Sequence, residues 1–354
     1  MFSIDDYNYA LPPELIAQQP LARRDRSRLL VLNRQDGRLD HRRFSDLHDL
    51  LSSSDVLVLN NTKVIPARLS GHKDSGGRAE LLLLDYAGNR KKESDPKTFR
   101  ADCLIKASKR PKPGASILFE KGLTATVLSV RENIFTTEFH WTGNFEDILY
   151  QIGKVPLPPY IKRTQAEDAA ADDRLAYQTV YASRKGAIAA PTAGFHFSKD
   201  FLTRIRARGV RIVEITLHIG YGTFLPVREA DIRRHKMHSE WYSISKASAE
   251  AINRAKANGD RIIAVGTTCV RTLEHSSSDH GIVAAGSGNC DLFIYPGYRF
   301  KSVDAMVTNF HLPRSTLLML ISAFAGRERV FEAYREAIKQ RYRFYSYGDA
   351  MFIT

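Results

Sequence analysis

Residues 261–275 read RIIAVGTTCVRTLEH, an apolar run that passes through a turn into a helical stretch. The run at 261–265 predicts a buried strand, and Gly266 and Thr267 supply the turn. Residues 268–275 predict a helix that follows the turn directly. The order strand, glycine turn, helix is typical of an open α/β sheet. This stretch therefore predicts an α/β fold.

The chain on both sides continues this alternation of strands and helices. Ser198 and Ser315 stand where a helix N-cap is expected, and Gly209 and Gly259 stand where a helix ends in a left-handed residue. The helix after Ser315 is apolar on nearly every face, so we expect it to be buried. The predicted helices lie at residues 245–258, 316–325 and 330–340. The predicted strands lie at residues 56–59, 211–219, 241–244, 291–300 and 305–309, with a short one from 188.

Residues 67–150 have a different character, with short runs separated by turn formers. The predicted strands lie at residues 79–85, 101–107, 116–120, 124–130 and 135–141. Glycine and proline separate these runs, and the spacing is typical of a small antiparallel barrel or sandwich. We therefore expect a discontinuous α/β body with an inserted all-β, barrel-like domain. The expected segments are 1–66 and 154–354 for the body, the second with most of the active site, and 67–153 for the insert.

Composition narrows the class of protein. The chain has 354 residues, 43% of them hydrophobic, and a formal net charge of +13, which favours polyanionic partners. A solvated basic face would explain the charge equally well. Three cysteines without CxxC spacing, Cys103, Cys269 and Cys290, fit neither a disulfide framework nor a structural zinc site. Residues 1–10 do not resemble a signal peptide, and no apolar run is long enough to span a bilayer, so we expect a cytoplasmic protein.

Three loops release polar residues at the ends of predicted strands. Residues 188–197 (IAAPTAGFHF), 217–224 (LHIGYGTF) and 307–314 (VTNFHLPR) share this design. Any one of them could be a plain turn with a hydrogen-bonded histidine. Open α/β sheets bind ligands where strands end, and three such loops can converge on one crevice. Together they predict an active site.

Two further segments could carry chemistry. The turn at 265–268 offers N–H groups and hydroxyls at a helix N-terminus, which suits a carboxylate or phosphate, although the hydroxyls could simply cap the helix. The chain contains no GxxxxGK[ST] or GxGxxG string, which argues against kinases and dehydrogenases. Residues 235–240 (HKMHSE) could be taken for metal ligands, but no second ligand cluster completes the set. We therefore expect no metal, and an acid/base or substrate-binding role for His238 and Glu240.

Basic residues near the start, in the insert and near the end could contact RNA. The candidates are Arg24, Arg28, Lys109, Arg110 and Lys112. Phosphate contact combined with base stacking requires cations beside aromatic residues, a mixture that 341–345 (RYRFY) also has. The alternative is a set of solvated charges. No standard RNA-binding string, such as an RNP or KH motif, occurs.

Longer strings can be taken together. They include YALPPELIAQQPLARRDRSRLLV (9–31), NNTKVIPARLSG (60–71), HKMHSEWYSI (235–244), VGTTCVRTLE (265–274) and TNFHLPRSTLLML (308–320). In this order, and over nearly the whole chain, they resemble the S-adenosylmethionine:tRNA ribosyltransferase-isomerase family of queuosine biosynthesis. The resemblance implies that the ribosyl part of S-adenosylmethionine is transferred to the aminomethyl group of a 7-deazaguanine in tRNA, giving epoxyqueuosine, adenine and methionine. It also implies that no metal or organic cofactor is needed.

Within the matched motifs the resemblance suggests roles for individual residues. The candidates for proton transfer are His196, His218, His238 and Glu240. The candidates for substrate binding are Asn61, Thr62, Arg68, Thr192, Phe195, Thr223, Thr267, Thr268, Arg271, Thr308, Asn309, His311 and Arg314. Phe195 and Tyr221 depart from the family pattern, where a smaller aliphatic residue and an alanine are expected. We expect a monomer, and the alternatives are a non-catalytic RNA-binding protein and a metal-dependent hydrolase.

Overall fold

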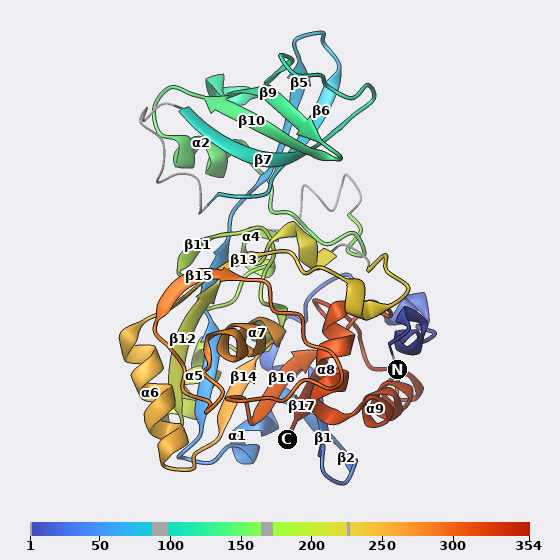
Figure 1. Cartoon of the computed structure of the whole chain (residues 1–354), viewed down its shortest axis with the longest axis vertical. Coiled ribbons are helices and arrows are strands. Elements are labelled where there is room, and N and C mark those ends of the chain that lie inside the picture. Colours follow the sequence, from blue (N-terminus) through green and yellow to red (C-terminus); the bar gives the residue numbers. More distant parts are fainter. Residues whose placement is uncertain (1, 87–97, 164–172, 225–226) are drawn as a thin grey trace.

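The computed structural model describes residues 2–86, 98–163, 173–224 and 227–354. Two parts are distinct in Figure 1: a large sheet covered by helices, here called the body, and a closed barrel above it. The fold class predicted from the sequence, an α/β body with a barrel-like all-β insertion, is confirmed. The boundaries of the three predicted segments stay a prediction.

The body is built on a nine-stranded sheet in the described part of the chain. The strand order is β15 (Gly286–Cys290), β13 (Glu240–Ile244), β12 (Arg211–Leu217), β3 (Val56–Asn60), β14 (Ile262–Val265), β16 (Ala305–Asn309), β17 (Ala350–Ile353), β1 (Arg28–Leu32) and β2 (Leu39–Arg43). The central strands β12, β3, β14 and β16 pair in parallel. Their carboxyl ends therefore meet at one edge of the sheet, and in Figure 1 this edge faces the barrel.

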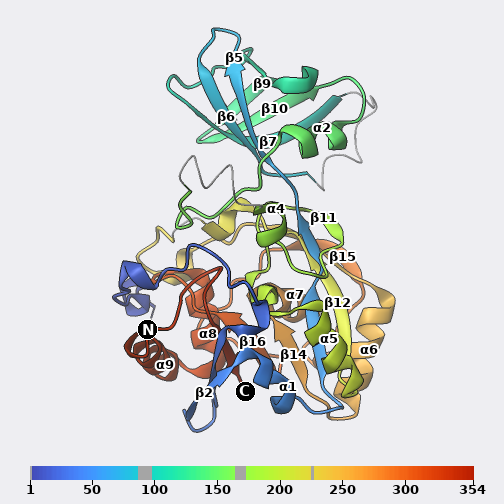
Figure 2. The same ribbon diagram turned by 180° about the vertical axis from the view of Figure 1, so that it is seen from behind.

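Helices cover both faces of this sheet. Val56 and Val58 of β3 belong to one hydrophobic core, whereas Leu57 and Leu59 of the same strand belong to the other, as the two-residue period of a strand requires. The first face carries α6 (Lys246–Ala257), α7 (Thr267–Ser276), α8 (Thr316–Ala325) and α9 (Arg327–Lys339). The second face, seen in Figure 2, carries α1 (Leu47–Leu50) and α5 (Lys199–Ala207).

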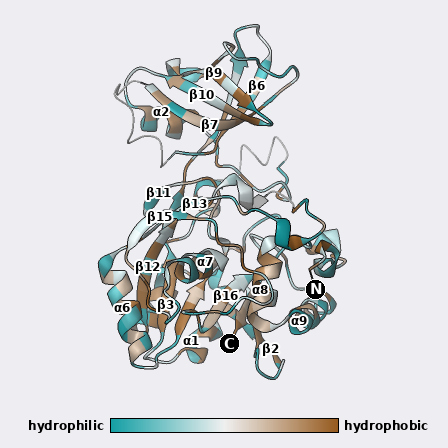
Figure 3. Ribbon diagram, viewed as in Figure 1, coloured by the Kyte–Doolittle hydropathy of each residue, from teal (hydrophilic) through white to brown (hydrophobic). Residues whose placement is uncertain are grey.

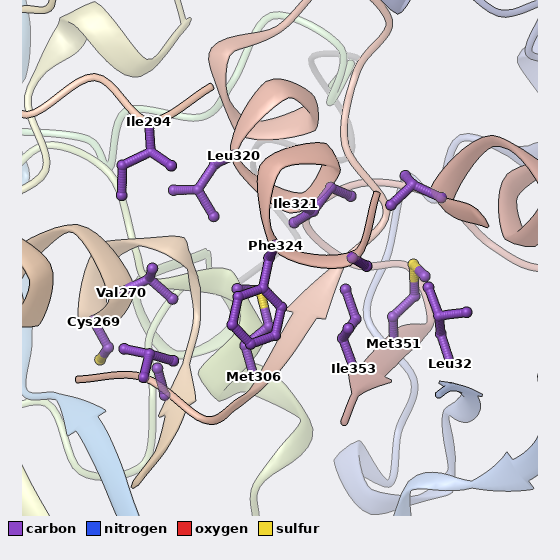
Figure 4. Close-up of a cluster of buried hydrophobic side chains, with 14 of the residues drawn as sticks. Leu32, Cys269, Val270, Ile294, Met306, Leu320, Ile321, Phe324, Met351 and Ile353 are labelled. Atoms are coloured by element: carbon purple, nitrogen blue, oxygen red, sulfur yellow. The ribbon is translucent and has the colours of Figure 1, made fainter. Parts of the chain in front are cut away.

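The core on the first face is densely apolar. In Figure 4 Phe324 of α8 lies against Met306 of β16, and Leu320 of the same helix lies near Ile294. The prediction that this helix is buried is confirmed, and Ser315 caps it through a hydrogen bond from the N–H of Leu318. The colouring of Figure 3 agrees, because apolar strands fill the body while α6 and α9 turn hydrophilic faces outward. Burial of such side chains supplies most of the folding free energy.

The barrel closes on itself in the order β10-β7-β6-β5-β8-β9. Its strands are β5 (Arg68–Lys73), β6 (Arg78–Leu83), β7 (Thr98–Ala107), β8 (Ser116–Leu118), β9 (Thr124–Arg131) and β10 (Ile134–His140). Helix α2 (Phe145–Ile152) packs Phe145 and Leu149 into the barrel core. The two connections between body and barrel run side by side, because Arg68 and Lys154 form an antiparallel bridge.

Smaller elements join these parts. Strands β4 (Thr62–Val64) and β11 (Arg184–Ala187) pair in parallel where the chain leaves the body. The remaining described elements are the short helices η1 (Ile4–Tyr7), η2 (Pro13–Leu15), η3 (Arg24–Arg26), η4 (Phe44–Asp46), η5 (Glu120–Gly122), α4 (Asp173–Ala176), η6 (Thr192–His196), η7 (Tyr221–Phe224) and η8 (Ile232–Arg234). None of the described helices is long and apolar enough to cross a membrane.

One predicted strand is wrong. Residues 291–300 contain no strand, because Pro296 lacks a backbone N–H and Gly297 adopts a left-handed φ of 106°. The edge strand of the sheet is instead the preceding segment β15, which pairs with β13. The short strand predicted from 188 is also displaced, since β11 ends at Ala187.

Candidate active site

A pocket of about 850 Å³ opens at the carboxyl edge of the parallel strands. This volume includes the open mouth of the pocket, which lies at the edge where open α/β sheets bind ligands. Its wall is formed by the start of α7, the loop after β16, the segment 189–193 before η6, and side chains from residues 160, 177, 345 and 346. The predicted site residues on this wall are Thr192, Thr267, Thr268, Arg271, Thr308, Asn309 and His311.

The N-terminus of α7 faces the pocket without a side-chain cap. Gly266 is the N-cap residue and has a φ of 89°, a backbone conformation that disfavours other residues. Thr267 and Thr268 both line the pocket, and the first N–H groups of a helix have no partner within it. The Oγ1 of Thr268 is buried without a hydrogen bond, and its sulfur neighbour in Cys269 is only a weak partner. This corner suits an anionic group.

Arg271 lies one turn further along α7, and its guanidinium is bound by other protein groups. Its guanidinium forms a buried ion pair with Glu240, and its remaining donors bind the carbonyl oxygens of Cys290 and Leu292. The other carboxylate oxygen of Glu240 accepts the N–H of Gly220 at 2.9 Å. The pair therefore holds β13, α7 and the loop after β12 together. This geometry favours a positioning role for both residues.

Asn309 ties three segments of the wall together. Its side-chain N–H₂ donates to the carbonyl oxygen of Tyr345 at 3.0 Å and faces Nε2 of His196 at 3.3 Å. Its side-chain oxygen accepts from the hydroxyl of Thr192 at 3.3 Å. Asn309 is 3% exposed, so it organises the wall more than it reaches into the pocket.

His196 is packed behind the pocket wall. Its Nδ1 lies 2.7 Å from Oγ of Ser27, its Nε2 faces Asn309, and its ring stacks on Phe44 at 4.9 Å. Burial lowers its pKa to about 3, so it is neutral near pH 7. With both ring nitrogens engaged, His196 has the geometry of a hydrogen-bonded core histidine. Its predicted role as a base stays a prediction.

His218 lies in a similar environment at the end of β12. Its Nδ1 is 2.7 Å from Oγ1 of Thr62, its ring stacks on Trp241, and Gly186 leaves the space that the ring occupies. Burial lowers its pKa to about 4. His218 does not line the pocket, whereas the next residue, Ile219, does.

His311 is the histidine on the pocket wall among the described residues. Its Nε2 lies 2.7 Å from Oγ1 of Thr308, and its backbone N–H donates to the hydroxyl of Tyr334. Burial lowers its pKa to about 3, so the ring is a neutral hydrogen-bonding group near pH 7. The sequence assigned His311 to substrate binding, which its position supports.

The other predicted site residues whose side chains the structure describes lie outside the pocket lining. Asn61 binds Glu214 and Thr216, and Arg68 starts the barrel. Arg314 is exposed, has a φ of 56° and pairs with Asp5 at 2.8 Å. The hydroxyl of Thr62 contacts the ring of His218, and Phe195 lines a second cavity behind the pocket wall. His238 is exposed, and its ring lies beside Gly222. The side chain of Thr223 is outside the described residues.

Sequence reasoning missed the aromatic part of the wall. Tyr160 and Tyr345 lie with ring centroids 4.8 Å apart, and Tyr177 and Ser346 stand beside them. The only signal in the sequence was the aromatic run at 342–345, which we assigned to RNA contact. Tyr160 follows a proline-rich segment with no periodicity. These residues meet only because distant segments converge in the fold.

The basic residues predicted to contact RNA differ in whether their side chains already bind other protein groups. Arg24 donates to the carbonyl oxygens of Leu175 and Gln178, and Arg28 pairs with Asp349 and stacks on Tyr342. Lys109, Arg110 and Lys112 are exposed on the barrel, with the Arg110 guanidinium 5.1 Å from the ring of Phe135. Among the described residues no group of three or more His, Cys, Asp or Glu side chains could hold a metal ion.

Comparison with known proteins gives consistent matches. The family model described as queuosine biosynthesis protein matches residues 4–353. The chain is 50% identical over 351 residues to S-adenosylmethionine:tRNA ribosyltransferase-isomerase of Geotalea uraniireducens (strain Rf4), with 99% of both chains covered. The protein of the same name from Citrifermentans bemidjiense is 51% identical over 350 residues, again covering 99% of both. The crystal structure of S-adenosylmethionine tRNA ribosyltransferase from Thermotoga maritima is 36% identical, with a TM-score of 0.54, covering 99% of this chain and 100% of that one.

Proposed function

The chain belongs to the queuosine biosynthesis protein family, and we propose that it is an S-adenosylmethionine:tRNA ribosyltransferase-isomerase. It transfers the ribosyl part of S-adenosylmethionine to the aminomethyl group of a 7-deazaguanine in tRNA and isomerises it to epoxyqueuosine. Adenine and methionine leave. The observation that carries the proposal is the 850 Å³ pocket, in which an uncapped helix N-terminus stands beside aromatic rings.

The pocket offers complementary chemistry for each part of S-adenosylmethionine. The methionine carboxylate binds the N–H groups of Thr267 and Thr268 and the unpaired hydroxyl of Thr268. The sulfonium carries a positive charge, which favours the faces of Tyr160 and Tyr345. The adenine and ribose occupy the remaining apolar space, which includes Phe310 and Leu312.

The chemistry needs a proton acceptor and a water-poor site. A sulfonium acidifies the neighbouring ribose carbon, so removal of a proton there gives an ylide that expels adenine by elimination. The amine of the tRNA base then attacks, and epoxide closure expels methionine. His311 is the neutral imidazole on the wall, so we propose that it accepts or relays this proton. Asn309 and the Arg271–Glu240 pair hold the wall in place.

No metal ion or organic cofactor enters this proposal, because S-adenosylmethionine is itself consumed. The partners are S-adenosylmethionine and a tRNA that carries the aminomethyl-deazaguanine precursor. We further propose that the protein acts as a monomer in the cytoplasm. Size-exclusion chromatography with light scattering tests the monomer.

Adenine release provides the decisive experiment. The protein is mixed with S-adenosylmethionine and precursor-modified tRNA, and adenine is measured by chromatography. We expect adenine and methionine in equal amounts, only when both substrates are present, and unchanged turnover with a chelator. A non-catalytic RNA-binding protein releases no adenine, and a metal-dependent hydrolase using His235, His238 and Glu240 loses activity with the chelator. Either result overturns the proposal.

A further inference from the structure

A second cavity of about 310 Å³ lies behind the wall of the first. Ser346 lines both cavities. Aromatic rings separate them, because Phe195 stacks on Tyr347 at 5.9 Å and Tyr177 meets both rings edge-on. Its lining includes Arg24 and His196, and the ribosyl-transfer chemistry proposed above uses neither.

This cavity is surrounded by positive charge. Arg24 is half-buried, and burial lowers its pKa, because the cation has lost water without gaining an anionic partner among the described residues. Arg343 is also partly buried, and its Nη1 is buried without a hydrogen bond. Both charges are close enough to His196 to lower the pKa of its ring. A desolvated Arg24 without a carboxylate partner among the described residues predicts an anion.

The carboxylates of this region bind other arginines. The pairs are Asp25 with Arg23 and Arg204, Asp173 with Arg163, and Asp349 with Arg28. Asp349 is near enough to raise the pKa of Arg343, but its oxygens also accept the N–H groups of Arg28 and Arg343. Arg24 itself donates to the carbonyl oxygens of Gln178 and Leu175, so its charge has no carboxylate partner among the described residues.

Tyr347 supplies an independent sign of a missing ligand. It lines the cavity, is 4% exposed, and its hydroxyl is buried without a hydrogen bond. Tyr347 and Arg24 both line this cavity. A buried hydroxyl without a partner is costly, so such groups in native proteins call for an explanation. An anionic oxygen between Tyr347 and Arg24 would satisfy both.

We propose that this second cavity binds one phosphate group of the tRNA backbone, through Arg24 and the hydroxyl of Tyr347. The inference rests on the proposed function for the identity of the RNA. Leu21 on the cavity lining and Leu175 beside it are 37% and 72% exposed, and the nucleoside attached to a phosphate would cover this apolar surface. Inorganic phosphate would leave it bare. The phosphate contact would thus fix the tRNA next to the pocket where its base reacts.

Tyr347→Phe isolates the proposed contact, because it removes a hydroxyl that has no partner within the described protein. Tyr150→Phe is the matched control, since the hydroxyl of Tyr150 is also buried without a hydrogen bond, but on α2 beside the barrel. Arg24→Gln and Arg24→Lys separate the loss of charge from the loss of shape. Binding of a precursor-modified anticodon stem-loop is measured by fluorescence anisotropy, and KM is measured for each substrate.

We expect Tyr347→Phe to weaken stem-loop binding and raise KM for tRNA about tenfold, with KM for S-adenosylmethionine unchanged. Arg24→Gln has a similar or larger effect, and Arg24→Lys recovers part of it. Tyr150→Phe binds as the unmodified protein does. Equal stem-loop binding by Tyr347→Phe and the unmodified protein overturns the inference.

A thermal-shift titration with inorganic phosphate distinguishes the two sources of the anion. If phosphate stabilises the unmodified protein but not Tyr347→Phe, while stem-loop binding is unchanged, the cavity holds a free anion and the tRNA assignment is wrong. Stem-loop binding needs no turnover. If the unmodified protein releases no adenine yet Tyr347→Phe still weakens stem-loop binding, the proposed function fails and the phosphate site stands.

Discussion

Arg271 and Glu240 form an ion pair in which the side chains are only 4% and 3% exposed. Breaking one half of such a pair leaves a buried charge without compensation. We expect Glu240→Gln to lower the free energy of unfolding by about 3 kcal/mol. Urea denaturation followed by circular dichroism measures the change. The wall of the pocket should loosen at the same time, because Arg271 anchors the carbonyl groups beside β15.

The exposed pair of Lys246 and Glu250 on α6 serves as the control. Its side chains are 87% and 56% exposed, and its charges lie 3.9 Å apart. Glu250→Gln should change the free energy of unfolding by less than about 0.5 kcal/mol, as expected for a solvated pair. Equal effects of the two substitutions would show that burial does not control the strength of the Arg271 pair.

Thr268→Ala tests the carboxylate corner of the pocket. Within the described protein the hydroxyl has only the weak sulfur partner Cys269 to lose, so the fold should tolerate the change. If the hydroxyl binds the methionine carboxylate, KM for S-adenosylmethionine should rise about tenfold, because hydrogen bonds to charged groups contribute roughly 1.5–3 kcal/mol. Ser276→Ala is matched to it, since Ser276 lies at the other end of α7 and its hydroxyl is also buried without a partner. Steady-state adenine release should be unaffected by the control.

His311→Gln and His218→Gln are a second matched pair. Each ring lies 2.7 Å from a threonine hydroxyl and has its pKa lowered by burial, but only His311 is on the pocket wall. We expect His311→Gln to lower kcat by about a hundredfold, the scale of a lost proton acceptor, and His218→Gln to keep kcat within about threefold. Rates are measured at saturating substrates. If kcat falls more in His218→Gln than in His311→Gln, His218 and not His311 is the proton acceptor.

Buried histidines should make stability depend on pH. The pKa values of His196, His218 and His311 fall from 6.5 to about 3, 4 and 3 on folding. Below pH 6.5 the unfolded chain therefore binds protons that the folded chain does not, so stability decreases as the pH falls toward 4. Between about pH 7.5 and about pH 5.5 the free energy of unfolding should drop by up to ~4 kcal/mol. Urea titrations at several pH values measure the slope, and His218→Gln should reduce it by about a third.

The parts of the fold that the sequence predicted are those with local signals. The turn at Gly266 and the helix caps at Ser198 and Ser315 depend on backbone preferences that neighbouring residues set. The pocket residues of α7 and of the loop after β16 were found because parallel strands deliver their carboxyl ends to one edge. Local chemistry and sheet topology suffice for these.

The missed features depend on long-range contacts and on side-chain direction. His196 and His218 carry the same pattern as His311 in the sequence, a histidine at a strand end, yet two of them face the core. Which way such a ring points is decided by partners such as Ser27 and Thr62, far away in the chain. Tyr160 and Tyr345 meet for the same reason.

The pairing of β1 with β17 sets the order in which the protein can fold during its synthesis. Arg28 donates its N–H to Asp349, a residue 321 positions later, and the neighbouring strands pair along their whole length. The barrel and α2, in contrast, use the contiguous residues 68–152. The barrel can therefore form while the ribosome is still translating the second half of the body. Strand β3 gains its partners β12 and β14 once residues 211–265 have emerged, whereas β1 and β2 join the rest of the sheet only after residues 350–353 emerge.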